Sequence, residues 1–247
     1  MLPLSARMVP PVAAVVDGIC REGSPEGLTE RREIAKPARR MNTQTMQFLT
    51  AADPVLGELI QRVGPITLRP RRLPPFQSLT QAVIYQQLSG KAADTILRRF
   101  RALFPGRGFP TPEQVRGMDV DRLRSAGLSR PKCAYLRSIA EHALQGTVPA
   151  LEECGRLTDG EMVERLTQIN GVGRWTVEML LIFNLGRPDV LPVHDLGVRR
   201  GYQIAYRKRG LPAPRHLERV GRAWAPYRTT AAWYLWRAVD VQGAAGW

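Results

Sequence analysis

Helical periodicity dominates this chain from about Thr50 onward. Apolar residues recur at three- and four-residue spacings, which is the repeat of an amphipathic helix. The segments with this pattern are Pro54–Val63, Gln77–Gln87, Lys91–Phe104, Ser129–Leu144, Thr158–Gln168, Arg174–Leu185, Leu196–Tyr206, Pro214–Trp224 and Tyr227–Val239. Alternating runs typical of strands are nearly absent, and Pro65–Leu68 is the one short candidate strand. The sequence therefore predicts an all-α fold with short loops.

The first 46 residues have a different character. They are rich in turn-forming pairs such as Pro10-Pro11, and their apolar residues follow no helical period. We expect residues 1–46 to form a flexible extension and residues 47–247 to form the folded domain. The apolar run Val12–Val16 ends at Asp17 and lacks a small-residue cleavage site, so it does not read as a signal peptide.

Composition excludes several classes of protein. No stretch approaches the roughly 20 apolar residues that a membrane-spanning helix needs. The three cysteines, Cys20, Cys133 and Cys154, are too far apart for a disulfide framework, a zinc site or an iron–sulfur cluster. We therefore expect a protein of a reducing compartment.

The charge of the chain points to a polyanionic partner. Lys and Arg number 36 against 22 Asp and Glu, which gives a formal net charge of +14. The alternative is a basic protein that binds no polyanion, but the charge is localised. Between Leu196 and Arg228, nine basic residues accompany the single acid Glu218, and the pattern there is helical. We expect this segment, with Arg199 and Arg200 near its start, to contact nucleic acid.

A glycine-containing turn separates two predicted helices at Gly171-Val172-Gly173. Gly171 and Gly173 can adopt backbone angles closed to other residues and bring the chain close to a ligand. The helix that begins near Arg174 directs its unpaired N–H groups into the turn, where they can hold a phosphate. The alternative is an ordinary turn between helices. As a phosphate site, the turn would bind the backbone and read no bases.

Asp195 lies 24 residues after Gly171, immediately before another predicted helix. That spacing leaves room for one helix and one loop, so the turn and Asp195 can face one ligand. The alternative is that Asp195 simply caps its helix, a role that Asp fills well. Asp195 can fill both roles, because a carboxylate at the N-terminus of a helix stays ionised and can still act on a ligand.

Three stretches in order carry a family resemblance. The segments Phe76–Ala93, Leu166–Leu196 and Pro226–Trp236 resemble the helix-hairpin-helix, Gly/Pro-rich-loop-and-Asp superfamily of DNA glycosylases, and within it the 3-methyladenine DNA glycosylase II type. The resemblance covers about Thr50 to Asp240 and lacks the N-terminal β domain of some members. It implies a two-lobed helical glycosylase fold with a helix-hairpin-helix motif.

The resemblance implies roles for several residues. Asp195 falls on the catalytic aspartate, which stabilises positive charge on the sugar or orients a water. Trp175 stands where lyase-competent relatives place a lysine, so no Schiff base can form there. Trp175 and Trp236, with Tyr85 as a weaker candidate, match the pocket for a flipped cationic base. The alternative for any tryptophan is core packing, which we favour for Trp224 and Trp233.

Further implied roles concern DNA contact. Leu88, preceded by Gln87, falls on the wedge that fills the gap left by an extruded nucleotide, although a buried loop leucine is the alternative. The carbonyls of Thr167, Ile169 and Val172 would hold a monovalent cation, as in hairpins of this family. The role of His194 stays open.

We therefore expect a monofunctional DNA glycosylase that excises alkylated purines from damaged duplex DNA. It would act as a monomer without an obligate protein partner and would need no cofactor and no catalytic metal. We expect it in the cytoplasm, associated with the nucleoid. One alternative is a related enzyme for oxidised or deaminated bases. The other is a helix-hairpin-helix module that binds DNA without catalysis, for which replacing Asp195 would alter nothing.

Overall fold

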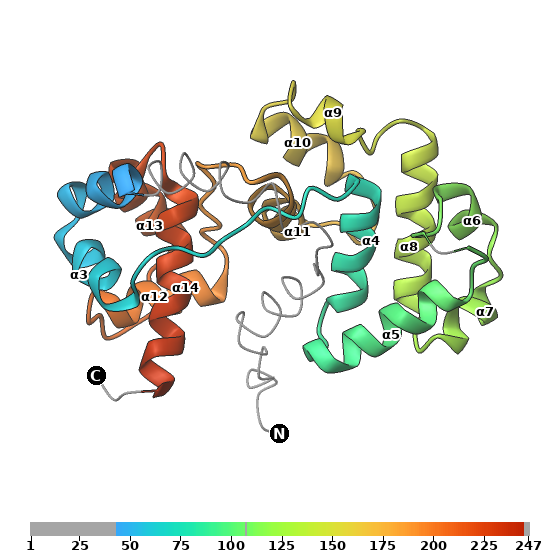
Figure 1. Ribbon diagram of the computed structural model, residues 1–247, viewed down its shortest axis with the longest axis horizontal. Coiled ribbons are helices and arrows are strands. Elements are labelled where there is room, and N and C mark those ends of the chain that lie inside the picture. Colours follow the sequence, from blue (N-terminus) through green and yellow to red (C-terminus); the bar gives the residue numbers. More distant parts are fainter. Residues whose placement is uncertain (1–42, 107, 245–247) are drawn as a thin grey trace, which may run out of the picture. The chain divides into compact units, whose positions relative to one another are not determined.

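The computed structural model describes residues 43–106 and 108–244 (Figure 1). The expected extension over residues 1–42 lies outside them. Residues 43–52 are helical, so the folded part begins before the expected boundary at residue 46. The hydroxyl of Tyr234 donates a hydrogen bond to the sulfur of Met46 at 3.2 Å, which anchors this first helix.

The described chain forms two compact units. One is continuous, residues 71–185, and contains the glycine turn. The other combines residues 43–70 with residues 186–244 and contains Asp195. Each unit is described by itself below.

The continuous unit is built around a long central helix. Its elements are α4 (Pro75–Tyr85), α5 (Gly90–Ala102), α6 (Pro112–Gly117), α7 (Val120–Ser125), α8 (Arg130–Leu144), α9 (Leu151–Cys154), α10 (Asp159–Leu166), α11 (Arg174–Met179) and a π-helix (Leu180–Leu185). The central helix α8 packs against α4, α6 and α7 (Figure 1). The side chain of Ser129 caps α8, and Thr158 with Glu161 forms a capping box on α10, so local sequence defines where both helices begin.

The two ends of the continuous unit are hydrogen-bonded to each other. The N–H groups of Arg71 and Arg72 donate to the carbonyls of Phe183 and Asn184, each at 3.0 Å. The side-chain amide of Asn184 pairs with the N–H and the carbonyl of Leu73, both at 2.9 Å. The prediction of one α-helix over Arg174–Leu185 is therefore corrected. The chain turns into a π-helix at Leu180, and its last carbonyls bond to an incoming segment.

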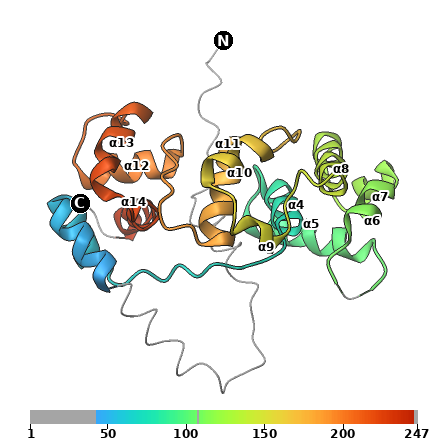
Figure 2. The same cartoon turned by 90° about the horizontal axis from the view of Figure 1, so that it is seen from above.

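The second unit is centred on the C-terminal helix. It contains residues 43–52, α3 (Pro54–Val63), α12 (Leu196–Ala205), α13 (Pro214–Val220), a 3₁₀ turn (Gly221–Trp224) and α14 (Arg228–Ala244). Helix α14 packs against α12 and α3 (Figure 2). Gly201 permits the close approach of α12, since a Cβ there would lie 1.8 Å from the carbonyl oxygen of Leu235 in α14.

A buried carboxylate joins three elements of the second unit. Asp53 caps α3 by accepting the N–H groups of Val55 and Leu56, each at 3.1 Å. Its other oxygen accepts the indole N–H of Trp224 at 2.9 Å and the hydroxyl of Tyr206. Burial and the adjacent Asp53 charge raise the pKa of Tyr206 far above its ordinary range, so this phenol stays a donor. Trp224 is fully buried and Trp233 nearly so, in line with the core roles expected of them.

The prediction of an all-α fold is confirmed, and no strand occurs in the described ranges. The candidate strand at Pro65–Leu68 is wrong, because that segment has no regular structure. The short helices α6, α7 and α9 were not predicted. Among the described helices, none has the length and apolar character required to cross a bilayer.

Candidate functional site

Asp195 is held at the start of α12 by two hydrogen-bond donors. One carboxylate oxygen, Oδ1, accepts the N–H of Val198 and the indole N–H of Trp236, each at 2.8 Å. The N–H of Asp195 donates to the carbonyl of Pro192 at 2.9 Å, which fixes the approach of the chain. The residue is only 4% exposed. The interpretation of Asp195 as a helix cap is therefore confirmed, and a second element also orients its carboxylate. Its catalytic role stays a prediction.

The second donor is present because α12 and α14 lie close together. Trp236 is on α14, one residue beyond Leu235, whose carbonyl occupies the space that a side chain at Gly201 would need. Trp236 is 3% exposed, and its N–H is directed at the carboxylate. The structure thus gives Trp236 a contact that the sequence did not predict. Its expected place in a base pocket stays a prediction.

This arrangement suits stabilisation of developing positive charge. Two donors on one oxygen restrict how the carboxylate can turn, so it need not reorganise during a reaction. A carboxylate fixed in this way can stabilise an oxocarbenium-like sugar or orient a water molecule. His194, which precedes it, is exposed.

The predicted hairpin lies between α10, which ends at Leu166, and α11, which begins at Arg174. Gly171 has φ +88°, and a Cβ on it would lie 2.3 Å from Cγ of Tyr135 in α8. The turn therefore requires glycine at this position, both for its backbone angle and for its packing. Gly173 is exposed, with open space where a side chain would go. Only one of the two glycines is thus demanded by the fold of the turn.

The loop between α4 and α5, Gln86–Ser89, carries the predicted wedge and is called the wedge loop below. Gln87 is exposed, with φ +59°, and Leu88 is half-buried. The N–H of Leu88 donates to the carbonyl of Tyr85 at 3.2 Å, which closes a tight turn. Tyr85 itself is 5% exposed, and its hydroxyl donates to Asp94 of α5. Insertion of Leu88 into DNA and a base contact by Tyr85 stay predictions, as does the base-pocket role of the half-buried Trp175.

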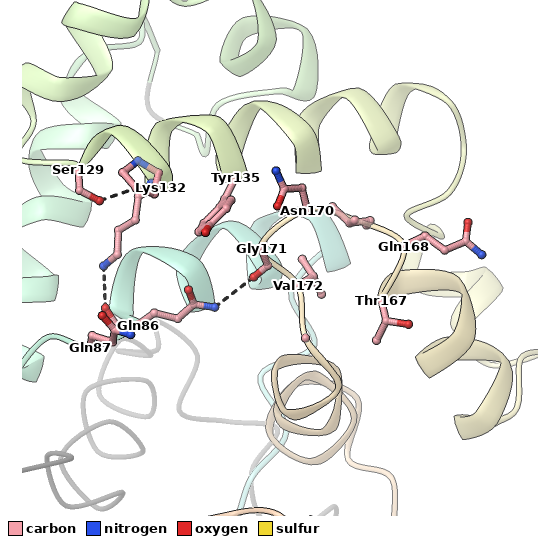
Figure 3. A pocket seen from close by; sticks show the side chains of 13 residues that line it. Gln86, Gln87, Ser129, Lys132, Tyr135, Thr167, Gln168, Asn170, Gly171 and Val172 are labelled. Atoms are coloured by element: carbon pink, nitrogen blue, oxygen red, sulfur yellow. Dashed lines mark hydrogen bonds between the residues drawn. The ribbon is translucent and has the colours of Figure 1, made fainter. Parts of the chain in front are cut away.

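A groove of about 910 Å³ lies between the wedge loop and the hairpin (Figure 3). It is lined by Gln86 and Gln87, by the first turns of α8, and by the hairpin residues Thr167–Gly173. From α8, the ammonium of Lys132 donates to two carbonyls at the end of α4. Burial lowers the pKa of Lys132 to about 8.

The three arginines expected to contact DNA have intramolecular partners. Arg174 pairs with the buried Glu178 at 3.1 Å. The guanidinium of Arg199 donates to the carbonyl of Pro212 at 2.9 Å, and that of Arg200 to the side chain of Gln203 at 2.5 Å. Arg174 and Arg200 are nonetheless exposed, whereas Arg199 is half-buried.

Arg199 also helps to shape a basic loop. The Gln203 side chain donates to the carbonyl of Arg209 at 3.1 Å, and the N–H of Lys208 donates to the carbonyl of Gln203 at 2.9 Å. These bonds fix the backbone of residues 206–212. The side chains of Arg207, Lys208 and Arg209 are left exposed at the C-terminal end of α12.

Three positions with contacts that shape the two units were missed from sequence. Lys132 acts on carbonyls 46 and 48 residues away, a contact that no spacing rule signals. Asn184 does the same for Leu73. Gly201 did have a signal, because an isolated glycine inside a helical pattern often marks close packing.

Comparison with known proteins places the chain in a family. Residues 80–226 match the family model described as HhH-GPD superfamily base excision DNA repair protein. The chain therefore belongs to the HhH-GPD superfamily.

Two relatives from one yeast are named as glycosylases or are described as similar to one. The chain is 44% identical over 199 residues to DNA-3-methyladenine glycosylase 1 of Schizosaccharomyces pombe, covering 79% of this chain and 86% of that protein. It is 34% identical over 193 residues to the alkylbase DNA glycosidase-like protein mag2 of the same yeast, covering 77% and 91%.

Two solved structures share the fold. The S. pombe 3-methyladenine DNA glycosylase in complex with abasic DNA matches with a TM-score of 0.71 at 43% identity, covering 78% of this chain and 95% of that one. The DNA-3-methyladenine glycosidase of Bacillus halodurans matches with a TM-score of 0.73 at 37% identity, covering 81% and 91%.

Proposed function

We propose that this protein is a monofunctional DNA glycosylase that hydrolyses the N-glycosidic bond of alkylated purines in duplex DNA. The observation that carries the proposal is the Asp195 carboxylate, buried and oriented by Val198 and Trp236. The identity of 44% to a 3-methyladenine glycosylase over most of both chains supports the same substrate class.

In the proposed reaction, the bond between C1′ of the sugar and the purine nitrogen breaks. The electron pair leaves with the base, which departs neutral because alkylation had already made it cationic. The carboxylate of Asp195 stabilises the positive charge that develops on the sugar. Water then adds to C1′ and gives up a proton, leaving an abasic site and a free base.

Strand cleavage does not belong to this mechanism. A lyase needs an amine that forms a Schiff base with the sugar. Trp175 occupies the position of the lyase lysine in the family resemblance, and it cannot form that adduct. The DNA strand should therefore stay intact until alkali cleaves the abasic site.

DNA binding is assigned to backbone contacts and basic side chains. The hairpin at Gly171 and Gly173 offers N–H groups, and Arg174, Arg199 and Arg200 supply charge. Three neutral carbonyls, those of Thr167, Ile169 and Val172, are proposed to hold a monovalent cation in the hairpin. The Ile169 carbonyl accepts the N–H of Val172 at 3.0 Å, and a carbonyl oxygen has a second lone pair for an ion.

We also propose that the protein works as a monomer in a reducing compartment. Cys133 and Cys154 are both buried thiols outside any disulfide, which suits reducing conditions.

The test compares wild-type protein with Asp195→Asn in single-turnover release of bases. Duplexes carry 3-methyladenine, 7-methylguanine or hypoxanthine, and DNA binding is measured in parallel. We expect the variant to bind DNA and to lose release by a factor of about 100 or more, as for removal of a main electrostatic stabiliser. We expect no nick before alkali treatment.

Two outcomes would reject the proposal. If wild-type protein released no alkylated purine, the substrate class would be wrong, and oxidised or deaminated bases would be tried next. If Asp195→Asn altered nothing while binding stayed salt-sensitive, the protein would be a binding module without catalysis.

A further inference from the structure

Lys132 joins two helices through backbone carbonyls. Its ammonium, reaching from the first turn of α8, donates to the carbonyls of Ile84 and Gln86 at 2.7 Å each. Figure 3 shows the contact with Gln86. Both carbonyls are at the C-terminal end of α4, where a helix has acceptors without intrahelical partners. A positive charge is also favoured there by the helix dipole. Lys132 thus ends α4 and fixes the direction in which the chain leaves it.

Gln86 extends this contact to the hairpin. Its side-chain amide donates to the carbonyl of Gly171 at 3.3 Å (Figure 3). The same amide also lies 3.5 Å from the hydroxyl of Thr176. Gly171 in turn packs against Tyr135, one turn along α8 from Lys132. The wedge loop, the hairpin and α8 are therefore connected through a single short chain of contacts.

The wedge loop needs such support. Gln87 adopts a left-handed backbone conformation, which a side-chain-bearing residue keeps only when its surroundings impose it. The residue before it is the one whose carbonyl Lys132 holds. The residue after it is Leu88, the predicted wedge.

Stability alone is a poor reason for a lysine at this site. Burial lowers its pKa to about 8, which means that the folded protein disfavours its charge. An apolar side chain packed there would avoid that cost, but it could not hold two carbonyls.

We propose that Lys132 is a positioning residue for base flipping. It holds the Gln86–Ser89 loop in the shape that presents Gln87 and Leu88 to DNA, and through Gln86 it couples that loop to the hairpin. This inference rests on the proposed glycosylase function.

The experiment uses the full-length protein and three variants. Lys132→Met removes both hydrogen bonds, and Lys132→Arg keeps donors for two carbonyls. Arg137→Met is the matched control, because it removes one positive charge from an exposed position of the same helix. Base flipping is followed by the fluorescence of 2-aminopurine placed beside the lesion, alongside single-turnover release and affinity for undamaged duplex.

We expect Lys132→Met to lower the flipping signal and the single-turnover rate about tenfold, as for the loss of two hydrogen bonds. Affinity for undamaged duplex should change by less than about twofold, because phosphate contacts dominate it. Lys132→Arg should restore most of the flipping, and Arg137→Met should behave like the wild type. A purely structural role would not give this split between flipping and binding.

Equal flipping and release in Lys132→Met and Arg137→Met would overturn the inference. If Lys132→Met does not fold, Lys132→Gln replaces it, since its shorter amide cannot span both carbonyls; wild-type flipping in that variant would be equally decisive. A wild-type protein that flips the base but releases none would reject the proposed function instead, and the flipping comparison would still judge Lys132.

Discussion

Trp236→Phe should impair catalysis more than it impairs the fold. The change keeps an aromatic ring in α14 but removes the indole N–H that donates to Oδ1 of Asp195 at 2.8 Å. The second donor, the N–H of Val198, remains. The carboxylate would then lose one of the bonds that set its orientation.

The size of the effect follows from that single bond. A hydrogen bond to a charged group contributes about 1.5–3 kcal/mol. If the whole of it acts in the transition state, the rate of base release falls by about 10- to 150-fold. The rate should be measured in single turnover with enzyme in excess over a duplex containing 3-methyladenine, so that product release does not limit it.

Trp233→Phe is the matched control. Trp233 is on the same helix and is 6% exposed, and it packs against Tyr234 and beneath Arg237. The substitution removes the same ring atoms without touching the Asp195 bond. We expect its rate to stay within about threefold of the wild type. Equal losses in the two variants would refute the reasoning, because the effect would then come from packing in α14.

Three further outcomes are expected. Gly201→Ala should destabilise the protein by about 2 kcal/mol in urea denaturation despite the better helix propensity of Ala, because the added Cβ meets the Leu235 carbonyl; unchanged stability would contradict the close packing. Replacing Arg207–Arg209 by glutamines should reduce the slope of log Kd against log salt by about 2, and an unchanged slope would remove this loop from the DNA-binding surface. For Lys132, with its pKa lowered to about 8, the folded protein loses a proton that the unfolded chain keeps until about pH 10.4, so stability should rise between these values. Because Lys132 is half-exposed, solvent screening reduces the expected effect. Between pH 7.5 and 9.5, the free energy of unfolding in urea should rise by about 1 kcal/mol more in the wild type than in Lys132→Met. A fall over this range would contradict a lowered pKa of Lys132.

Local signals account for most of the correct predictions about the fold. The bounds of α3 agree with the sequence, because Pro54 starts the helix and a stripe of apolar residues runs to Val63. Ser129 and Thr158 mark the starts of α8 and α10, because each side chain caps the helix that follows it. In contrast, α6, α7 and α9 have six residues or fewer, too few for a periodic pattern to appear.

In the candidate site too, local features were predictable from the sequence and contacts between distant residues were not. Asp195 could be found because its residue type, its position before a helix and the family motif coincide. Its bond to Trp236 depends on the distance between α12 and α14, which is set by packing rather than by any local signal. The hydrogen bonds from Lys132 to the end of α4 also join residues far apart in the sequence. Their acceptors are backbone carbonyls, which every residue has, so no residue type signals them.

The hydrogen bonds between residues 71–73 and residues 183–184 bear on how the chain folds as it is made. The unit that contains Asp195 is discontinuous, and its two parts are separated by the whole of residues 71–185. Closing so long an unstructured loop would cost about 4 kcal/mol in chain entropy. The continuous unit, once folded, holds its own two ends side by side and removes most of that cost. Synthesis from the N-terminus therefore favours an order in which the hairpin unit forms first and residues 43–70 wait for α12 and α14. The setting of the Asp195 carboxylate would be assembled last, on a chain whose hairpin has already folded.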